Sequence, residues 1–274
     1  MSNDITGRPR ALMTGASSGI GAAFAKRLAK DGYDLIIAAR RRDKLEALAA
    51  QLQSNHQSNI EVMVADLSKS DDLRAVEKRV AEDTSLELLV NNAGFGAYMP
   101  FIELDPDKAE ELINVQVVAV MRLTHAALPG MIARGRGAII NISSRLAFSG
   151  PMGSTQLPKR ATYAGTKSFV ITFSQLVQSE LEGTGIQVQA LCPGLVRTEF
   201  HELVGMDPNR FPPQMIMKAE DLVEASLVGL KLGEVICIPA LEDAALLRQV
   251  QEDQRRLFET SATGKVATRY STGK

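Results

Sequence analysis

Short apolar runs alternate with longer segments of helical periodicity along most of the chain. Between the runs, apolar residues recur three and four positions apart, as at Ile20, Phe24 and Leu28, which predicts helices. Strands that are apolar on both faces and alternate with helices are typical of a parallel sheet covered on both sides. We therefore predict a single Rossmann-type, doubly wound α/β domain with a seven-stranded, mostly parallel sheet, helices on both faces and ligands at the carboxyl ends of the strands. The predicted strands are 11–15, 33–40, 60–66, 86–94, 137–143, 186–194 and 234–240.

The same pattern divides the chain into a domain and a tail. We expect one domain over residues 1–260, in which the segment 244–261 forms an amphipathic helix. Residues 261–274 have weak periodicity, so we expect a flexible C-terminal tail. The sequence contains no internal repeat and no low-complexity block.

Composition and charge narrow the class of function. The 274 residues are 45% hydrophobic, which is enough for a large core, and 31 basic residues nearly cancel 32 acidic ones. This balance argues against a nucleic-acid binder or a membrane-surface binder. The two cysteines, Cys192 and Cys237, are too few for a disulfide framework or a structural zinc site, so we expect buried free thiols. The three histidines lack metal-ligand spacing, so we expect no metal.

No targeting or membrane segment is evident in the sequence. The first ten residues, MSNDITGRPR, have no apolar core of the kind found in signal peptides. No uncharged apolar run reaches membrane-spanning length. We therefore expect a cytoplasmic protein without a membrane span.

A glycine-rich turn, TGASSGIG at residues 14–21, lies between the first predicted strand and the first predicted helix. Gly15 can allow the tight turn, while Gly19 and Gly21 can let a pyrophosphate and a helix approach closely at the positive helix N-terminus. Three residues and then one separate these glycines, which differs from the usual dinucleotide fingerprint. The alternative is an ordinary tight strand-to-helix turn.

Two arginines follow the second predicted strand. A cofactor with a free ribose 2′-hydroxyl favours a carboxylate at this place, but the sequence has Ala39 and then Arg40 and Arg41. A guanidinium there can hold a 2′-phosphate through charge-assisted hydrogen bonds. This indicates NADP(H) rather than NAD(H), with a solvated arginine cluster as the alternative.

The segment ATYAGTKSF, residues 161–169, places Tyr163 and Lys167 on the same face of a predicted helix. A free tyrosine has a pKa of about 10, which makes it a poor acid or base near neutrality. A lysine one turn away lowers that pKa because it favours the phenolate. Such a tyrosine could exchange a proton with the oxygen that gains charge during hydride transfer to a carbonyl. Packing of the tyrosine in an amphipathic helix is the alternative.

In combination, these motifs resemble the short-chain dehydrogenase/reductase family over about Arg10 to about Pro239. TGASSGIG is similar to the family's cofactor glycine motif, and NNAG at 91–94 is similar to its motif after the fourth strand. Tyr163 and Lys167 match its Tyr-x-x-x-Lys, and PGLVRT at 193–198 resembles the segment that holds the nicotinamide carboxamide. Six such motifs occur in the family's order, and their combination makes the resemblance specific.

The resemblance implies a catalytic set of Asn114, Ser144, Tyr163 and Lys167. Ser144 is preferred to Ser143 because the family's serine occupies the last place of the pattern NISS. The resemblance also implies that Lys167 reaches the ribose hydroxyls and that Asn114 holds a water linking Lys167 to solvent. For Asn114 the alternative is a buried helix residue bonded to backbone. Asn92 is interpreted as a structural turn residue near the cofactor.

The motifs together define the expected cofactor site, with Asp66 near the adenine. The expected cofactor-binding residues are Gly15, Ser17, Ser18, Gly19, Ile20, Gly21, Arg40, Arg41, Asp66, Leu67, Asn92, Ala93, Gly94, Tyr163, Lys167, Pro193, Gly194, Val196 and Thr198.

The expected activity is NADP(H)-dependent interconversion of a ketone or aldehyde and an alcohol, with NADP(H) preferred over NAD(H). The alternatives are a catalytically silent NADP(H)-binding sensor or scaffold, and an epimerase or dehydratase of the same family. Relative to the family, the loop between Ser144 and Tyr163 and the segment beyond Ala240 are long, and we expect the loop to select the substrate. The resemblance also suggests a homodimer or homotetramer.

Apolar residues around the site favour a mostly apolar small-molecule substrate. A possible lid carries Phe200, Met206, Phe211, Met215 and Met217, and Leu146, Phe148 and Met152 lie in the long loop. His201, in the same possible lid, could touch the substrate.

Overall fold

The computed structural model describes residues 7–153, 157, 159–198 and 211–270. One sheet has the strand order β3-β2-β1-β4-β5-β6-β9, and every neighbouring pair in it is parallel. This confirms the predicted Rossmann-type sheet. Its strands are β1 (Arg10–Thr14), β2 (Asp34–Ala39), β3 (Ile60–Val64), β4 (Leu86–Asn91), β5 (Gly137–Ile142), β6 (Ile186–Leu191) and β9 (Ile236–Cys237).

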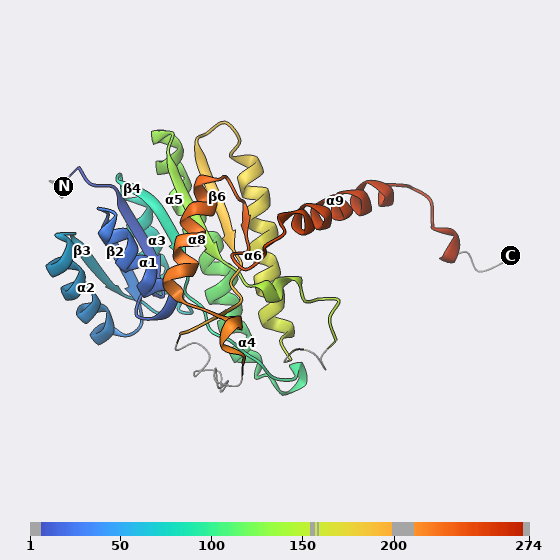
Figure 1. The fold of residues 1–274 in the computed structure, drawn as a ribbon, viewed down its shortest axis with the longest axis horizontal. Coiled ribbons are helices and arrows are strands. Elements are labelled where there is room, and N and C mark those ends of the chain that lie inside the picture. The colour runs from blue at the N-terminus through green and yellow to red at the C-terminus, as the bar shows by residue number, and fades with distance from the viewer. Residues whose placement is uncertain (1–6, 154–156, 158, 199–210, 271–274) are drawn as a thin grey trace. The chain divides into compact units, whose positions relative to one another are not determined.

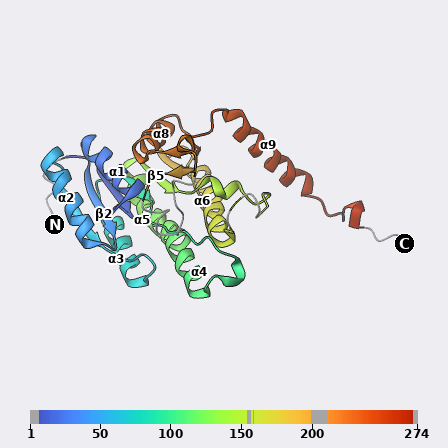
Figure 2. The same cartoon turned by 60° about the horizontal axis from the view of Figure 1, so that its bottom comes forward.

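Helices cover both faces of the sheet (Figures 1 and 2). On one face, the core is built from α1 (Gly19–Lys30), α2 (Arg42–His56) and α8 (Ala219–Lys231). On the other face, it includes α3 (Ser70–Ala81) and α5 (Ala119–Arg134), and α6 (Ala161–Glu180) packs beside them against β6. The buried face of α2 is apolar and consists of Leu45, Leu48, Ala49 and Leu52.

The strands end earlier than the apolar pattern predicts. The pattern continues to Gly94 and Gly194, but β4 ends at Asn91 and β6 ends at Leu191. The following residues leave the hydrogen-bonded ladder and form loops at the carboxyl edge, where a parallel sheet binds its ligands. The last predicted strand, 234–240, contains only the pair Ile236–Cys237, and Pro239 has no N–H to offer to a longer ladder.

A second, two-stranded sheet was not predicted from the sequence. β7 (Leu195–Val196) pairs in parallel with β8 (Ile216–Met217), so the segment after β6 is tied to the segment before α8. Val196 is buried in the same core as α1 and α8. The pairing of β7 with β8 and the burial of Val196 hold the middle of the PGLVRT segment beside the main sheet.

The contacts within the chain group residues 1–239 and 240–274 into two compact units. The second unit contains α9 (Ala244–Ser261), which confirms the predicted amphipathic helix, and a short turn at Thr268–Tyr270. Asp243 caps α9 by accepting a hydrogen bond from the N–H of Ala245. The flexibility predicted for the tail stays a prediction.

A π-helical turn, Asn114–Val118, interrupts the long helical segment that follows Asp105. Asp105 caps α4 (Pro106–Ile113), and Pro106 occupies the first position. By length and composition, the helical segment Pro106–Arg134 is apolar enough to cross a membrane. Its buried side chains pack against the sheet and α3. Elsewhere, both cysteines are buried free thiols, as predicted.

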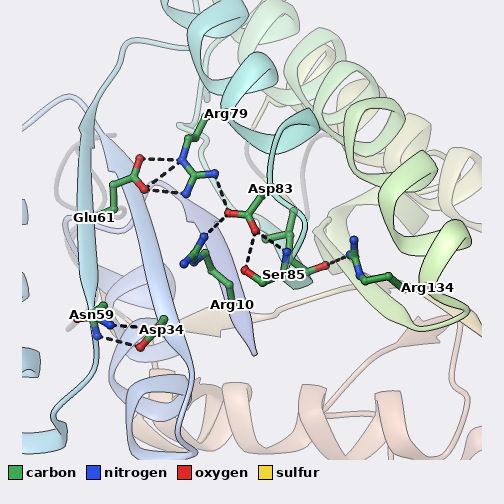
Figure 3. Close-up of polar contacts among 9 residues, drawn as sticks. Arg10, Asp34, Asn59, Glu61, Arg79, Asp83, Ser85 and Arg134 are labelled. Carbon is green, nitrogen blue, oxygen red and sulfur yellow. Dashed lines mark hydrogen bonds and ion pairs between the residues drawn. The ribbon is translucent and has the colours of Figure 1, made fainter. Parts of the chain in front are cut away.

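Asp83 joins three elements at the edge where β1 and β4 begin (Figure 3). Its Oδ2 accepts hydrogen bonds from Arg10 Nη1 at 2.8 Å and Arg79 Nη1 at 2.7 Å, while Oδ1 accepts from the N–H and hydroxyl of Ser85, both at 2.9 Å. Arg79 also binds Glu61 on β3. Burial alone would raise the pKa of Asp83, but these hydrogen bonds outweigh it and lower that pKa.

We predict that Asp83→Asn lowers the free energy of unfolding by about 2–4 kcal/mol, because two guanidinium groups lose a shared buried carboxylate. The wild-type stabilisation should be complete above the ordinary aspartate pKa of about 3.9 and be lost as the pH falls through the lower folded-state value. Denaturant unfolding near neutral pH and near pH 3 measures both effects. Glu182→Gln, at an exposed position after α6, is the control. An equal loss for Asp83→Asn at both pH values would contradict this account.

Candidate active site

A cavity of about 230 Å³ opens at the carboxyl ends of the strands. It lies where the strand order reverses between β1 and β4, which is where open α/β sheets bind ligands. Thus residues from four separate predicted motifs meet in one place. The expected site residues that line the cavity are Gly15, Ser18, Gly19, Ile20, Asn92, Gly94, Ser144, Tyr163, Lys167, Pro193, Gly194, Val196 and Thr198.

The glycine turn needs its glycines for steric reasons. Gly15 has a φ of 66°, and a Cβ there would lie 2.8 Å from Asn92 Nδ2 and 2.9 Å from Ala93 Cα. A Cβ on Gly21 would lie 2.5 Å from the carbonyl oxygen of Gly15, and one on Gly19 would lie 3.0 Å from Thr198 Cβ. The glycines therefore let β1, the NNAG loop and the PGLVRT segment approach the start of α1 together.

Asn92 holds the ends of β1 and β4 together, as expected for a structural turn residue. Its Nδ2 donates to the carbonyl oxygens of Thr14 and Gly15 at 2.9 and 3.2 Å. In return, the hydroxyl oxygen of Thr14 accepts from the N–H groups of Asn92 and Ala93, both at 3.0 Å. This reciprocal pairing keeps the crevice open at the N-terminus of α1.

Arg41 lies across the glycine turn. Its Nη2 donates to the hydroxyls of Ser17 and Ser18 at 3.0 and 2.6 Å, and its Nε lies 3.2 Å from Ser17 Oγ. Ser18 precedes α1 but makes no side-chain capping bond, so the first N–H groups of this helix face the crevice. One guanidinium, two hydroxyls and a helix N-terminus thus form a group of donors suited to phosphate oxygens.

Three other expected cofactor residues lie beside this group but outside the cavity lining. Arg40 is mostly exposed and lies 3.7 Å from Glu111 on α4. Asp66 is half-buried: burial acts to raise its pKa, but two hydrogen bonds from Ser68 outweigh burial and lower it. Leu67 is buried in the core.

Tyr163 and Lys167 are both buried, at 6% and 5% exposure. The Nζ of Lys167 lies 5.6 Å from the centroid of the Tyr163 ring and donates to the carbonyl oxygen of Ile142 at 2.9 Å. The hydroxyl of Ser144 hydrogen-bonds the side chain of Tyr163. Ser143 instead donates to the main-chain carbonyl of Lys167 at 2.8 Å, so the two serines have different partners.

The expected lowering of the Tyr163 pKa by Lys167 is not found. Burial raises the pKa of Tyr163 to about 12, and the hydrogen bonds of Ser144 and Tyr98 offset only part of this rise. Burial also lowers the pKa of Lys167 to about 7, so the lysine carries less charge with which to favour a phenolate. The sequence reveals the spacing of the pair but not that both groups are desolvated.

Asn114 and Gln116 lie in the π-helical turn Asn114–Val118 between α4 and α5. Asn114 is half-buried and does not line the cavity, whereas the buried Gln116 does. Nε2 of Gln116 donates to the carbonyl oxygen of Phe95 at 2.6 Å, and its Oε1 lies 3.2 Å from the hydroxyl of Thr166 on α6. Sequence reasoning missed Gln116. The available signal was a lone amide in the otherwise apolar run VQVVAV.

The cavity wall opposite the glycine turn is largely apolar. Phe95, Tyr98, Leu146, Leu157 and Phe211 line it, and Arg145 adds one charge. Of the possible lid, Phe211 lies in this wall and Met215 is exposed, while Phe200, His201 and Met206 lie outside the described residues. Sequence reasoning missed Phe95 and Tyr98, which come from the loop just after NNAG. No group of side chains that could hold a metal occurs among the described residues.

Arg160 fastens the long loop before α6. Its buried guanidinium donates to the hydroxyl and the carbonyl oxygen of Ser149, at 2.8 and 2.9 Å, and lies 3.3 Å from the carbonyl oxygen of Met152. These bonds hold the described start of the loop, including the turn Arg145–Phe148, against the N-terminus of α6. The described start of the loop, residues 145–153, is thus fastened beside the cavity.

Side chains that can exchange a proton, next to a dinucleotide-type glycine turn, define a dehydrogenase or reductase site. Residues 9–208 match the family model described as short chain dehydrogenase. The chain therefore belongs to the short-chain dehydrogenase/reductase family and is an oxidoreductase. Curated relatives include a very-long-chain 3-oxoacyl-CoA reductase of Anas platyrhynchos, 31% identical over 84% of this chain and 72% of that protein.

Two solved structures resemble the whole fold. A short-chain dehydrogenase from Sphingobium yanoikuyae in complex with NADPH is 37% identical, with a TM-score of 0.89 over 96% of this chain and 100% of that chain. A bulky-bulky ketone specific alcohol dehydrogenase from Comamonas testosteroni is 33% identical, with a TM-score of 0.86 over 96% of this chain and 98% of that chain.

We predict that Arg160→Ala loosens the long loop without unfolding the sheet. Loss of two or three hydrogen bonds to main-chain and hydroxyl oxygens should speed amide hydrogen exchange in residues 145–153 about tenfold or more. Exchange in β1 and β4 should be unchanged. Lys159→Ala, at the exposed neighbouring position, is the control. Equal protection of residues 145–153 in wild type and Arg160→Ala would refute the fastening role.

Proposed function

We propose that this protein is an NADP(H)-dependent oxidoreductase that interconverts a bulky, mostly apolar ketone or aldehyde and the corresponding alcohol. The observation that carries the proposal is the convergence of Ser144, Tyr163 and Lys167 in a buried cavity beside the glycine turn. A silent binding protein would have no need to keep three polar, reactive side chains buried together, since burial of such groups costs stability.

The residues present fit a nicotinamide dinucleotide. Gly15, Gly19 and Ile20 line the cavity, and the N–H groups at the start of α1 suit a pyrophosphate. Lys167 and five residues of the PGLVRT segment, namely Pro193, Gly194, Leu195, Val196 and Thr198, line the same cavity, which supports the ribose and carboxamide contacts implied by the family resemblance. When bound, the nicotinamide supplies or accepts the hydride.

The roles of the side chains follow from their positions. Ser144 can donate a hydrogen bond to the substrate oxygen and so hold it beside the hydroxyl of Tyr163. Tyr163 gives its proton to that oxygen during reduction and takes it back during oxidation. Lys167 stabilises the resulting phenolate when protonated, and its lowered pKa makes that help dependent on pH. Asn114 lies in the π-helical turn, and for this residue we retain the proposed role of holding a water that links Lys167 to solvent.

The preference for NADP(H) rests on Arg41, Ser17 and Ser18. Their donors already converge in the structure, and no carboxylate follows β2 at the place where a ribose 2′-hydroxyl would need one. Arg40 is the outer member of the pair and is free to reorient, because its contact with Glu111 is long and exposed. The NADPH complex of the S. yanoikuyae relative supports the same cofactor.

The apolar wall of the cavity supports a bulky hydrophobic substrate. Phe95, Leu146 and Leu157 offer no fixed charge to a polar substituent. The ketone specificity named for the C. testosteroni relative agrees with this, and an acyl thioester is a second carbonyl class suggested by the duck relative. We also retain the proposals of a cytoplasmic location and a homodimer or homotetramer.

We predict that Tyr163→Phe lowers kcat for ketone reduction about 1000-fold, within the range seen when a positioned acid is lost. NADPH binding, followed by its fluorescence, should stay measurable, because the aromatic ring and Lys167 remain. Activity is followed as NADPH consumption against a panel of bulky ketones, aldehydes, sugars and acyl thioesters. Tyr33→Phe, which removes a half-buried hydroxyl away from the cavity, is the control. Full activity of Tyr163→Phe would contradict the mechanism.

The same assays on the wild-type protein distinguish the alternative functions. Tight cofactor binding without turnover of any carbonyl would favour a sensor, and retained cofactor without net redox change would favour an epimerase or dehydratase.

We predict that Arg41→Ala raises the KM for NADPH about tenfold or more while it changes the KM for NADH far less, since only NADPH presents a 2′-phosphate to the guanidinium. Arg42→Ala removes the next arginine, which is exposed and pairs with Glu46, and is the matched control. Steady-state kinetics with both cofactors measure the change. A wild-type protein that prefers NADH would overturn the arginine argument.

A further inference from the structure

A second tyrosine lies against Tyr163 in the cavity. The ring centroids of Tyr98 and Tyr163 are 5.3 Å apart and the rings meet edge to face at 65°. The two side chains are hydrogen-bonded to each other. Tyr163 is buried in one small apolar cluster with Ala97, Leu104 and Leu112, and the partly buried Tyr98 packs against this cluster, which strengthens a hydrogen bond between the two.

Provided that the proposed function holds, we propose that Tyr98 is a positioning residue for proton transfer, whose hydroxyl donates a hydrogen bond to the oxygen of Tyr163 and stabilises its phenolate. In this arrangement Ser144 and Tyr98 reach the same phenolic oxygen from different elements, the loop after β5 and the loop after β4. A phenolate oxygen can accept both bonds, while a phenol still has its own proton to give to a substrate oxygen.

The loop that carries Tyr98 is fixed to the helix that carries Tyr163. Gln116 donates to the carbonyl oxygen of Phe95 in this loop, and its own side-chain oxygen lies 3.2 Å from the hydroxyl of Thr166. The same hydroxyl lies 2.8 Å from the main-chain carbonyl of Tyr163. One amide side chain therefore links the two tyrosine-bearing segments, which holds their spacing when a substrate enters.

The surroundings affect the pKa values of the two tyrosines differently, so that Tyr98 serves as the hydrogen-bond donor and Tyr163 as the group that ionises. Burial, followed by repulsion from a Tyr163 phenolate, raises the pKa of Tyr98. Tyr98 thus stays protonated throughout the working pH range and remains a donor, while Tyr163 is the member that ionises. The pKa of Tyr163 lies below the value that burial alone would set, because Ser144 and Tyr98 both stabilise its ionised form.

The other titratable groups near Tyr163 come from its own helix and from two further elements. Lys167 lies one turn along α6, Cys192 after β6 lies close to Lys167, and Arg145 lines the same cavity. The thiol of Cys192 has a pKa raised to about 12 by burial, so it stays neutral. Lys167 and Arg145 are retained in a Tyr98 variant, and any change in the pH profile can be compared against this constant background.

The test uses Tyr98→Phe, which keeps the edge-to-face ring contact and removes only the hydroxyl. Alcohol oxidation requires the phenolate of Tyr163, so its kcat/KM rises with pH through the pKa of that group. Loss of the hydrogen bond should move this rise to higher pH by about one unit, equivalent to an about tenfold lower kcat/KM at a fixed pH below the rise. Tyr33→Phe is the matched control for removal of a tyrosine hydroxyl.

A second measurement needs neither cofactor nor substrate. The protein has four tyrosines, so the Tyr163 signal can be followed by NMR in protein labelled at the tyrosine Cζ atoms and identified through Tyr163→Phe. The Tyr163 shift should change in Tyr98→Phe and not in Tyr33→Phe, in folded protein as judged by circular dichroism. An unmoved pH profile in an active Tyr98→Phe enzyme overturns the inference. If the wild type turns over no carbonyl, the proposed function fails, and an unchanged Tyr163 signal then overturns the Tyr98 inference separately.

Discussion

The reciprocal hydrogen bonds between Thr14 and Asn92 are the constraint on which the site depends. They join the carboxyl ends of β1 and β4, the two neighbouring strands at which the order of the sheet reverses. The turn after β1 can be this close only because Gly15 and Gly21 lack a Cβ. Once these two strand ends are joined, the helix α1 starts at the crevice, and the loops after β4, β5 and β6 all open toward the same cavity.

Below the cavity, buried polar side chains hold the supporting elements in register. Asn91 on β4 donates to Asn141 on β5 at 2.8 Å, and Asn141 donates to Ser174 on α6 at 3.0 Å. In a low-dielectric interior such bonds are strong, and a mismatched register would leave amides unpaired. This network fixes the position of α6, which carries Tyr163 and Lys167, relative to the sheet. Burial raises the pKa of Tyr163 and lowers the pKa of Lys167, and so favours the neutral form of each side chain.

Sequence reasoning predicted those parts of the molecule whose causes are local. The parallel sheet, the glycine turn and the helix 244–261 each follow from a repeated pattern or a short motif. The strand ends were overestimated, because the apolar runs continue into loops that line the cavity. Gln116 was missed because the π-helical turn changes which side chains of the helix face inward, and the sequence carries no marker for that turn.

Tyr98 shows a different limit of sequence reasoning. It stands 65 positions before Tyr163, and only the folded sheet brings the loop after β4 against α6. The spacing of Tyr163 and Lys167 suggested that the lysine sets the acidity of the tyrosine. In the structure both are desolvated, so neutral hydroxyl donors carry much of that task. A neutral donor gains strength from the same burial that weakens a charged lysine, because it loses little solvation when water is excluded. In an apolar pocket, the ionised form of a tyrosine is therefore supported better by neutral hydroxyl donors, such as those of Ser144 and Tyr98, than by a desolvated lysine.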